Sequence, residues 1–243
     1  MSDTNNTDEQ APMDGAVDLE IAARPRRLDD FEVGRVLPAP ARRMVGPFAF
    51  FDHMGPASLA PGRGMDVRPH PHIGLATVTY LFEGEILHRD SLGSVQPIRP
   101  GAINWMTAGR GIVHSERTPS QARASGPSLH GLQLWAALPG THEEVEPAFS
   151  HHPADSIPEL DDRGVRLRVL AGAAYGATSP APIASPLVYV EAHLDAGARL
   201  ELPRDVEERA VYVITGAVRS GQTSIPPSTM AVFRPHTAAT LEA

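Results

Sequence analysis

Cysteine is absent from this chain of 243 residues. A disulfide framework is therefore excluded, and any metal site must use nitrogen and oxygen ligands. The absence is compatible with a reducing cytoplasm, which is the location that we expect. No apolar run approaches the ~18 residues that a membrane-spanning helix needs, and the N-terminus lacks a basic region followed by an apolar one. The sequence therefore predicts neither a membrane span nor a secretory signal.

Aromatic residues and basic runs are also scarce. Aromatics make up 5% of the chain, whereas Gly and Pro number 21 and 24, a mix that favours short strands and turns over long helices. The formal net charge is −8, and there is no long Lys/Arg run. Since direct nucleic-acid binding needs a basic patch to offset phosphate charge, we expect no nucleic-acid partner. We expect the chain to be a monomer.

The organisation along the chain predicts two β-lobes. Residues 1–18 are acidic and polar and predict a disordered tail. The first lobe is expected over 19–140, an acidic connection over 141–162, and a second lobe over 163–243. Val78–Gly84 can be laid over Ala210–Gly216, because both contain an apolar strand that ends at glycine. Since no segment has a sustained 3.6-residue period, the sequence predicts an all-β fold of two stacked barrels or sandwiches.

Two pairs of polar residues stand out in strand-like segments. His70 and His72 alternate with Pro69 and Pro71. Side chains at i and i+2 of a strand point to the same face, so both imidazoles can reach one ion, and the prolines indicate a strand start or a sheet edge. Taken alone, this pair also fits two surface imidazoles.

A second pair, His114 and Glu116, has the same spacing and follows a glycine turn at Gly109-Arg110-Gly111. Two such pairs facing each other inside a barrel supply three imidazoles and one carboxylate. That set suits a borderline divalent metal such as Fe(II), Mn(II), Ni(II), Cu(II) or Zn(II). Four protein ligands on an octahedral ion leave two positions open for chemistry.

At these residues the chain resembles the cupins. Gly64, His70, His72 and Gly84 fit the first cupin motif, and Pro100-Gly101 with His114 fits the second. Within the cupins, the run PHPHIGLATVTYLFEG followed by NWMTAGRGIVHSE resembles the signature of the pirin family. The resemblance is strong from about Phe48 to Trp135 and is weaker but consistent to the end of the chain.

The resemblance implies a bicupin with one metal ion, most simply iron, in the N-terminal lobe. Its ligands would be His70, His72, His114 and Glu116. General cupin motifs often place a glutamate ligand shortly after His-x-His, but Ile73–Thr77 holds no carboxylate. Glu116 is therefore the only acidic ligand available, which agrees with the pirin pattern.

The second lobe lacks an equivalent ligand set. Alignment on the shared glycine and proline places Leu202 and Arg204 opposite the first pair, and Leu241 and Ala243 opposite the second. We therefore expect the C-terminal cupin lobe to be free of metal. Known pirins continue further than Ala243, so the closing elements of this lobe are expected to be missing.

The pirin resemblance implies two functions. The first is a dioxygenase of the quercetin 2,3-dioxygenase type, acting on a flavonol or similar enol, with Glu116 as ligand and, when displaced, as catalytic base. The second is a metal- or redox-dependent regulatory protein that binds a transcription factor or a metabolic enzyme.

Other polar residues carry weaker interpretations. Asp52-His53 fits a buried hydrogen-bonded turn, or a support for a ligand. His88-Arg89-Asp90 is expected on a solvated face, His130 is expected to be structural, and His151-His152 is expected to be exposed.

Overall fold

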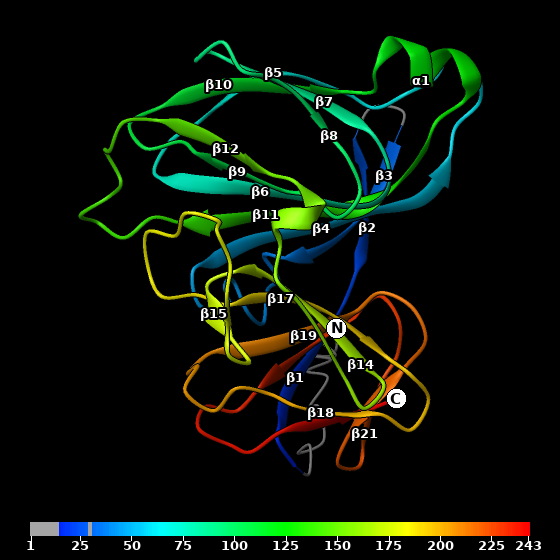
Figure 1. The fold of residues 1–243 in the computed structure, drawn as a ribbon, viewed down its shortest axis with the longest axis vertical. Helices are drawn as coiled ribbons and strands as arrows, with labels where there is room; N and C mark the ends of the chain where they lie inside the picture. Colours follow the sequence, from blue (N-terminus) through cyan, green and yellow to red (C-terminus); the bar gives the residue numbers. More distant parts are fainter. Residues whose placement is uncertain (1–14, 29–30) are drawn as a thin grey trace, which may run out of the picture.

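The computed structural model describes residues 15–28 and 31–243. These residues form two β-lobes stacked along the long axis of the molecule (Figure 1). The predicted all-β class is confirmed, because the helices of the described residues are only α1 (Ser120–Ser125) and the 3-10 turn η1 (Ala154–Ser156). Within that part of the chain, no helix is long and apolar enough to span a membrane.

The first lobe is built from two antiparallel sheets. The larger has seven strands in the order β12 (Ala148–His152), β9 (Ile103–Thr107), β6 (Leu75–Gly84), β11 (Ser128–Ala137), β4 (Phe48–Ser58), β3 (Phe31–Leu37) and β2 (Arg24–Leu28). The smaller has four strands in the order β5 (Asp66–His72), β10 (Ile112–Arg117), β7 (Ile86–Asp90) and β8 (Val95–Ile98).

Strand β6 shows why the seven-stranded sheet is buried on both faces. Thr77 and Thr79 face the interior of the first lobe, where the Thr79 hydroxyl lies 3.1 Å from a carboxylate oxygen of Glu116. Val78 and Tyr80 alternate with them and belong to a core cluster that also contains residues of the second lobe. The strand is therefore buried without interruption from Ala76 to Leu81, because each of its faces packs against protein.

Glycine is required where β6 turns into β7. Gly84 has a φ of +91°, and a Cβ atom there would lie 2.2 Å from the carbonyl oxygen of Ser128. No side chain fits in that space, and L-residues rarely adopt this backbone conformation. Gly84 therefore lets the chain pass directly from β6 in the larger sheet to β7 in the smaller one.

The second lobe is made of short strands in four small sheets. Their orders are β1 (Val17–Ala22), β22 (Thr229–Phe233), β19 (Arg209–Val213); β13 (Glu159–Asp162), β14 (Val165–Ala171), β17 (Tyr189–Leu194); β15 (Ala173–Ala174), β16 (Ala177–Thr178); and β18 (Arg199–Glu201), β23 (Thr240–Glu242), β20 (Val218–Ser220), β21 (Thr223–Ile225). A second core cluster fills this lobe.

Two boundaries differ from the sequence expectation. Most of the predicted tail lies outside the described residues, but Val17 and Asp18 belong to β1, which pairs with β22 of the second lobe. The dark blue strand therefore lies in the lower lobe of Figure 1. The expected connection over 141–162 also contains β12, which extends the large sheet of the first lobe by pairing with β9. Neither pairing could be predicted from the sequence, because both segments have polar, acidic surroundings and their partner strands are distant along the chain.

Candidate metal centre

His70 and His72 lie on β5, at the edge of the four-stranded sheet. The sheet edge predicted from Pro69 and Pro71 is confirmed, since a missing backbone N–H leaves no ladder bond unmade on an outer strand. The two Nε2 atoms lie only 3.0 Å apart. The alternation of the strand has therefore placed both imidazoles on one face, as the spacing predicts.

His114 and Glu116 lie on β10, the neighbour of β5. Ile112, His114 and Glu116 are buried, whereas the residues between them are more exposed. His114 is directly opposite His70 on β5. The second pair therefore points into the same interior as the first.

The three imidazoles converge on one point. The ligand nitrogens of His70, His72 and His114 all lie within 4.8 Å of one another. His70 Nδ1 lies 2.8 Å from the backbone carbonyl of Arg68 and donates to it, so its Nε2 carries the lone pair. His114 Nε2 is buried and has no hydrogen-bond partner.

Buried lone pairs that face one another without a donor are unfavourable unless a cation lies between them. The unpartnered nitrogen of His114 is therefore what a bound divalent ion would satisfy, together with the ligand nitrogens of His70 and His72 in the same group. The donor set, nitrogen and oxygen without sulfur, fits a borderline metal.

Glu116 lies behind this triad. Its carboxylate belongs to a second, overlapping group with His88 and His114 that also has metal-ligating geometry. The structure thus brings three of the four predicted ligands into one group and connects the fourth to it through His114. That all four hold the same ion remains a prediction.

The sequence interpretation of His88 and Asp90 was wrong. Both side chains are buried, with exposed fractions of 2% and 0%, and His88 Nε2 lies 3.1 Å from Asp90 Oδ2, within hydrogen-bond distance. They face the interior because β7 pairs with β10, which places His88 opposite Glu116. The signal was available, since His88 and Asp90 have the same i, i+2 spacing as the two ligand pairs.

Aromatic rings enclose the site. Trp135 meets His72 edge to face with a centroid distance of 5.0 Å, and Phe50 stacks on Trp135 at 4.1 Å. Phe149 of β12 stacks on His88 at 4.2 Å. These rings exclude water and fix the planes of the two imidazoles.

Burial shifts the titration of the site residues. It lowers the pKa of His72 to about 4 and that of His114 to about 3, and the neighbouring imidazoles add to both effects. Burial raises the pKa of Glu116 to about 7, against a hydrogen bond from Thr79 that lowers it. His72 and His114 are therefore neutral at neutral pH, as metal binding requires.

These shifts predict that the metal-free protein loses stability as pH falls from neutral. An unfolded histidine titrates near ~6.5, so between that value and about 4 the unfolded chain binds protons that folded His72, His114 and His53 do not. Stability from these residues is complete above ~6.5 and is lost as pH falls through the range. Glu116 acts in the opposite direction, since its pKa is raised on folding.

The test is the free energy of unfolding in urea between pH ~7.5 and ~4.5. We expect a decline towards acid that is shallower in His72→Gln and steeper in Glu116→Gln. Equal profiles in all three proteins would contradict the assigned shifts.

Asp52 and His53 lie on β4 and not in a turn. Asp52 accepts two hydrogen bonds of 2.8 Å from Arg35. His53 faces the second lobe, with Nδ1 at 2.8 Å from the Tyr212 hydroxyl and Nε2 at 2.9 Å from Nε2 of His130. His53 therefore supports the contact between the lobes, and neither alternative drawn from the sequence describes it.

His151 and His152 are partly buried on β12, which corrects the expectation that they are exposed. His151 Nδ1 lies 2.7 Å from the side-chain oxygen of Asn104. Arg110, in the glycine turn, forms an exposed ion pair with Glu146.

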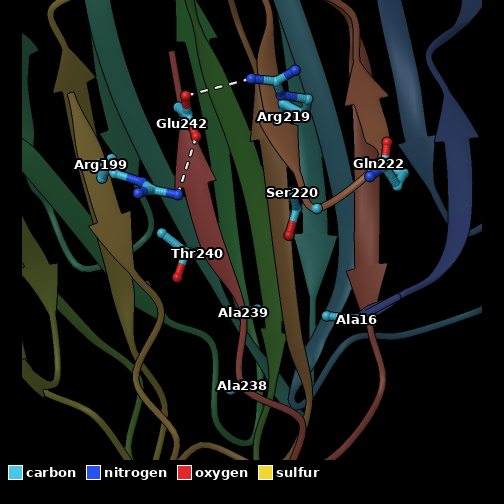
Figure 2. A pocket seen from close by; sticks show the side chains of 10 residues that line it. Ala16, Arg199, Arg219, Ser220, Gln222, Ala238, Ala239, Thr240 and Glu242 are labelled. Carbon is cyan, nitrogen blue, oxygen red and sulfur yellow. Dashed lines mark hydrogen bonds and ion pairs between the residues drawn. The ribbon is translucent and has the colours of Figure 1, made fainter. Parts of the chain in front are cut away.

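The second lobe has a hollow of about 450 Å³ (Figure 2). Figure 2 shows Arg199 and Arg219 on either side of Glu242, at 3.2 and 3.4 Å from its oxygens. No histidine lines this hollow. Both groups with metal-ligating geometry among the described residues belong to the first lobe.

Comparison with known proteins agrees with the resemblance seen in the sequence. The family model described as Pirin matches residues 30–136. A pirin-like protein of Caulobacter vibrioides is 51% identical over 223 residues, which cover 90% of this chain and 77% of the relative. The predicted bicupin fold is confirmed by a crystal structure of quercetin 2,3-dioxygenase from Acinetobacter baumannii, with a TM-score of 0.85 and 34% identity over 93% of this chain and 74% of that one.

A crystal structure of the bacterial pirin YhhW from Escherichia coli in complex with nickel(II) has a TM-score of 0.60 and 15% identity. It covers 92% of this chain and 96% of its own, and at this identity the likeness concerns the fold alone. The match to the family model extends through the segment that carries both ligand pairs, His70 with His72 and His114 with Glu116. This chain belongs to the pirin family.

Proposed function

We propose that this chain is a mononuclear-metal dioxygenase that opens the ring of a flavonol or a related enol with dioxygen as the oxidant. The observation that carries the proposal is the group of His70, His72 and His114, two of them buried, in which one buried nitrogen has no partner. A structure with 34% identity to this chain is that of a quercetin 2,3-dioxygenase.

In this function His70, His72, His114 and Glu116 hold the ion, and iron(II) fits the nitrogen and oxygen donor set. When bound, the metal supplies a Lewis-acid and redox centre that lowers the pKa of a coordinated hydroxyl. The imidazoles act as neutral ligands, so the site keeps a net positive charge that favours an enolate.

Glu116 would accept the proton of the enol hydroxyl. The Thr79 hydroxyl donates to one carboxylate oxygen at 3.1 Å, so the other oxygen would hold the ion and, when displaced from it, would take the proton. Trp135 and Phe50 exclude water from one side of the site, which strengthens every charge interaction within it.

The experiment is dioxygen uptake with a panel of flavonols and enols. The protein is stripped of metal, loaded anaerobically with Fe(II), and then mixed with aerated substrate. We expect uptake in step with loss of the flavonol absorbance, and none from the metal-free sample. Loading with Mn(II), Ni(II), Cu(II) and Zn(II) in parallel identifies which ion supports turnover.

A second candidate is a metal-dependent regulatory protein, and one surface feature favours it. Exposed apolar side chains gather on the sheet that carries the ligands and on its connections: Ile73, Leu92, Val95 and Val113. Val113 precedes His114, and Ile73 follows His72. A change at the metal would therefore reach this surface through single peptide units. A fully loaded protein without uptake on any substrate in the panel would favour this function over the first.

A further inference from the structure

Three buried side chains, Asp90, His88 and His114, form a hydrogen-bonded row that leads to the imidazole triad. Asp90 Oδ2 lies 3.1 Å from His88 Nε2, and His88 Nδ1 lies 3.4 Å from His114 Nδ1. The row ends at His114 Nε2, the buried nitrogen without a partner. The proposed reaction assigns no role to Asp90 or His88.

The order of donors along the row follows from its first member. The Asp90 carboxylate only accepts hydrogen bonds, so His88 Nε2 carries a proton and donates it. Neutral His88 then has a lone pair on Nδ1, which accepts the proton of His114 Nδ1. His114 Nε2 is left with its lone pair towards the position between His70 and His72.

Both supporting side chains are held from several sides. The other oxygen of Asp90 accepts hydrogen bonds from the backbone amides of Leu92 and Ser94, at 2.9 and 3.0 Å. Phe149 stacks on the His88 ring with an interplanar angle of 13°. Neither side chain can therefore turn without breaking these contacts.

We propose that Asp90 and His88 are positioning residues that fix the tautomer and the ring orientation of His114 as a metal ligand. The inference rests on the metal centre of the proposed function and adds to it the residues that make His114 ready to bind. Hydrogen-bond partners of ligating histidines commonly act in this way, and their loss costs ~10- to 100-fold in metal affinity.

Asp90→Asn is the most informative variant because it reverses the direction of the hydrogen bonds along the row. The Asn oxygen can still accept from the amides of Leu92 and Ser94, while its NH₂ group donates to His88 Nε2. His88 must then donate from Nδ1 to His114, and the proton of His114 moves to Nε2, where it blocks the ligand. We expect metal affinity to fall ~10- to 100-fold.

The second variant is the double substitution Asp90→Asn with His88→Phe. Phenylalanine keeps the stack on Phe149 but has no nitrogen to impose the wrong tautomer on His114. We expect the double variant to bind metal more tightly than Asp90→Asn alone. A purely structural role predicts that the second substitution adds to the loss.

The experiment measures Ni(II) affinity by competition with a chelator, and ¹⁵N chemical shifts of His114 in the metal-free proteins. The wild type is expected to carry the His114 proton on Nδ1 and Asp90→Asn to carry it on Nε2. The shifts need neither metal nor turnover, so they test the row even if the proposed metal centre or reaction fails. Thermal unfolding of each variant controls for folding.

Two results would overturn the inference. One is an unchanged His114 tautomer in Asp90→Asn together with wild-type affinity for Ni(II). The other is a wild type that binds two ions, one of which is lost with His88→Phe, because the group His88, His114 and Glu116 would then be a second cation site. If Asp90→Asn fails to fold, the test uses His88→Phe alone. A His114 that keeps a single Nδ1–H tautomer in that variant would reject the role of the row in fixing the tautomer.

Discussion

The His114→Ala variant is expected to purify almost free of metal, whereas the wild type carries about one ion per chain. His114 is the member of the triad that belongs to both groups with metal-ligating geometry. Its loss removes one nitrogen ligand. It also removes the residue that connects the group of His70 and His72 to the group that contains Glu116. Because the side chain is only 2% exposed, the substitution also opens a cavity and lowers stability.

His70→Ala separates metal loss from folding. His70 is only partly buried, at the edge of the sheet, so its removal leaves the core intact. We expect the same loss of metal with little change in thermal unfolding of the metal-free protein. The matched control is His193→Ala, which removes a 65% exposed imidazole from the second lobe. Equal metal content in the wild type and both site variants would reject the assigned ligands.

The two ligand pairs could be found in the sequence because strand periodicity is a local property. Two residues at i and i+2 of a predicted strand have side chains on the same face. In the structure this holds for His70 and His72 on β5 and for His114 and Glu116 on β10. The same rule applied to His88 and Asp90. Their charge suggested a solvated face, and only the pairing of β7 with β10 shows that this face is the interior.

Other features depend on contacts between distant segments. Val17 pairs with Phe233, and Phe149 reaches His88 because β12 joins β9. Local composition favoured a tail and a connection at these places, since acidic and proline-rich segments are usually solvated. Tertiary pairing overrides this preference when the apolar side chains find a partner surface. The position of Glu116 relative to the triad likewise depends on side-chain placement, which no spacing rule predicts.

Glu116→Gln is expected to retain a weakly bound metal but to slow flavonol oxidation by ~10²-fold or more, the usual contribution of a positioned base. Glutamine keeps the shape of the buried side chain, and its carbonyl oxygen can still accept the hydrogen bond from Thr79. The three imidazoles remain, so the ion is held by neutral donors alone. What disappears is the negative charge and the oxygen that takes the proton.

Metal content and dioxygen uptake are measured on the same samples of wild type, Glu116→Gln and Glu85→Gln. Glu85 lies at the turn into β7 of the same lobe and pairs with the exposed Arg99, so its substitution controls for loss of one carboxylate. Rates are compared at equal metal occupancy, because a slower variant with less metal says nothing about the base. Full turnover by metal-loaded Glu116→Gln would reject Glu116 as the proton acceptor. The ligand role of Glu116 would then be tested by metal affinity alone.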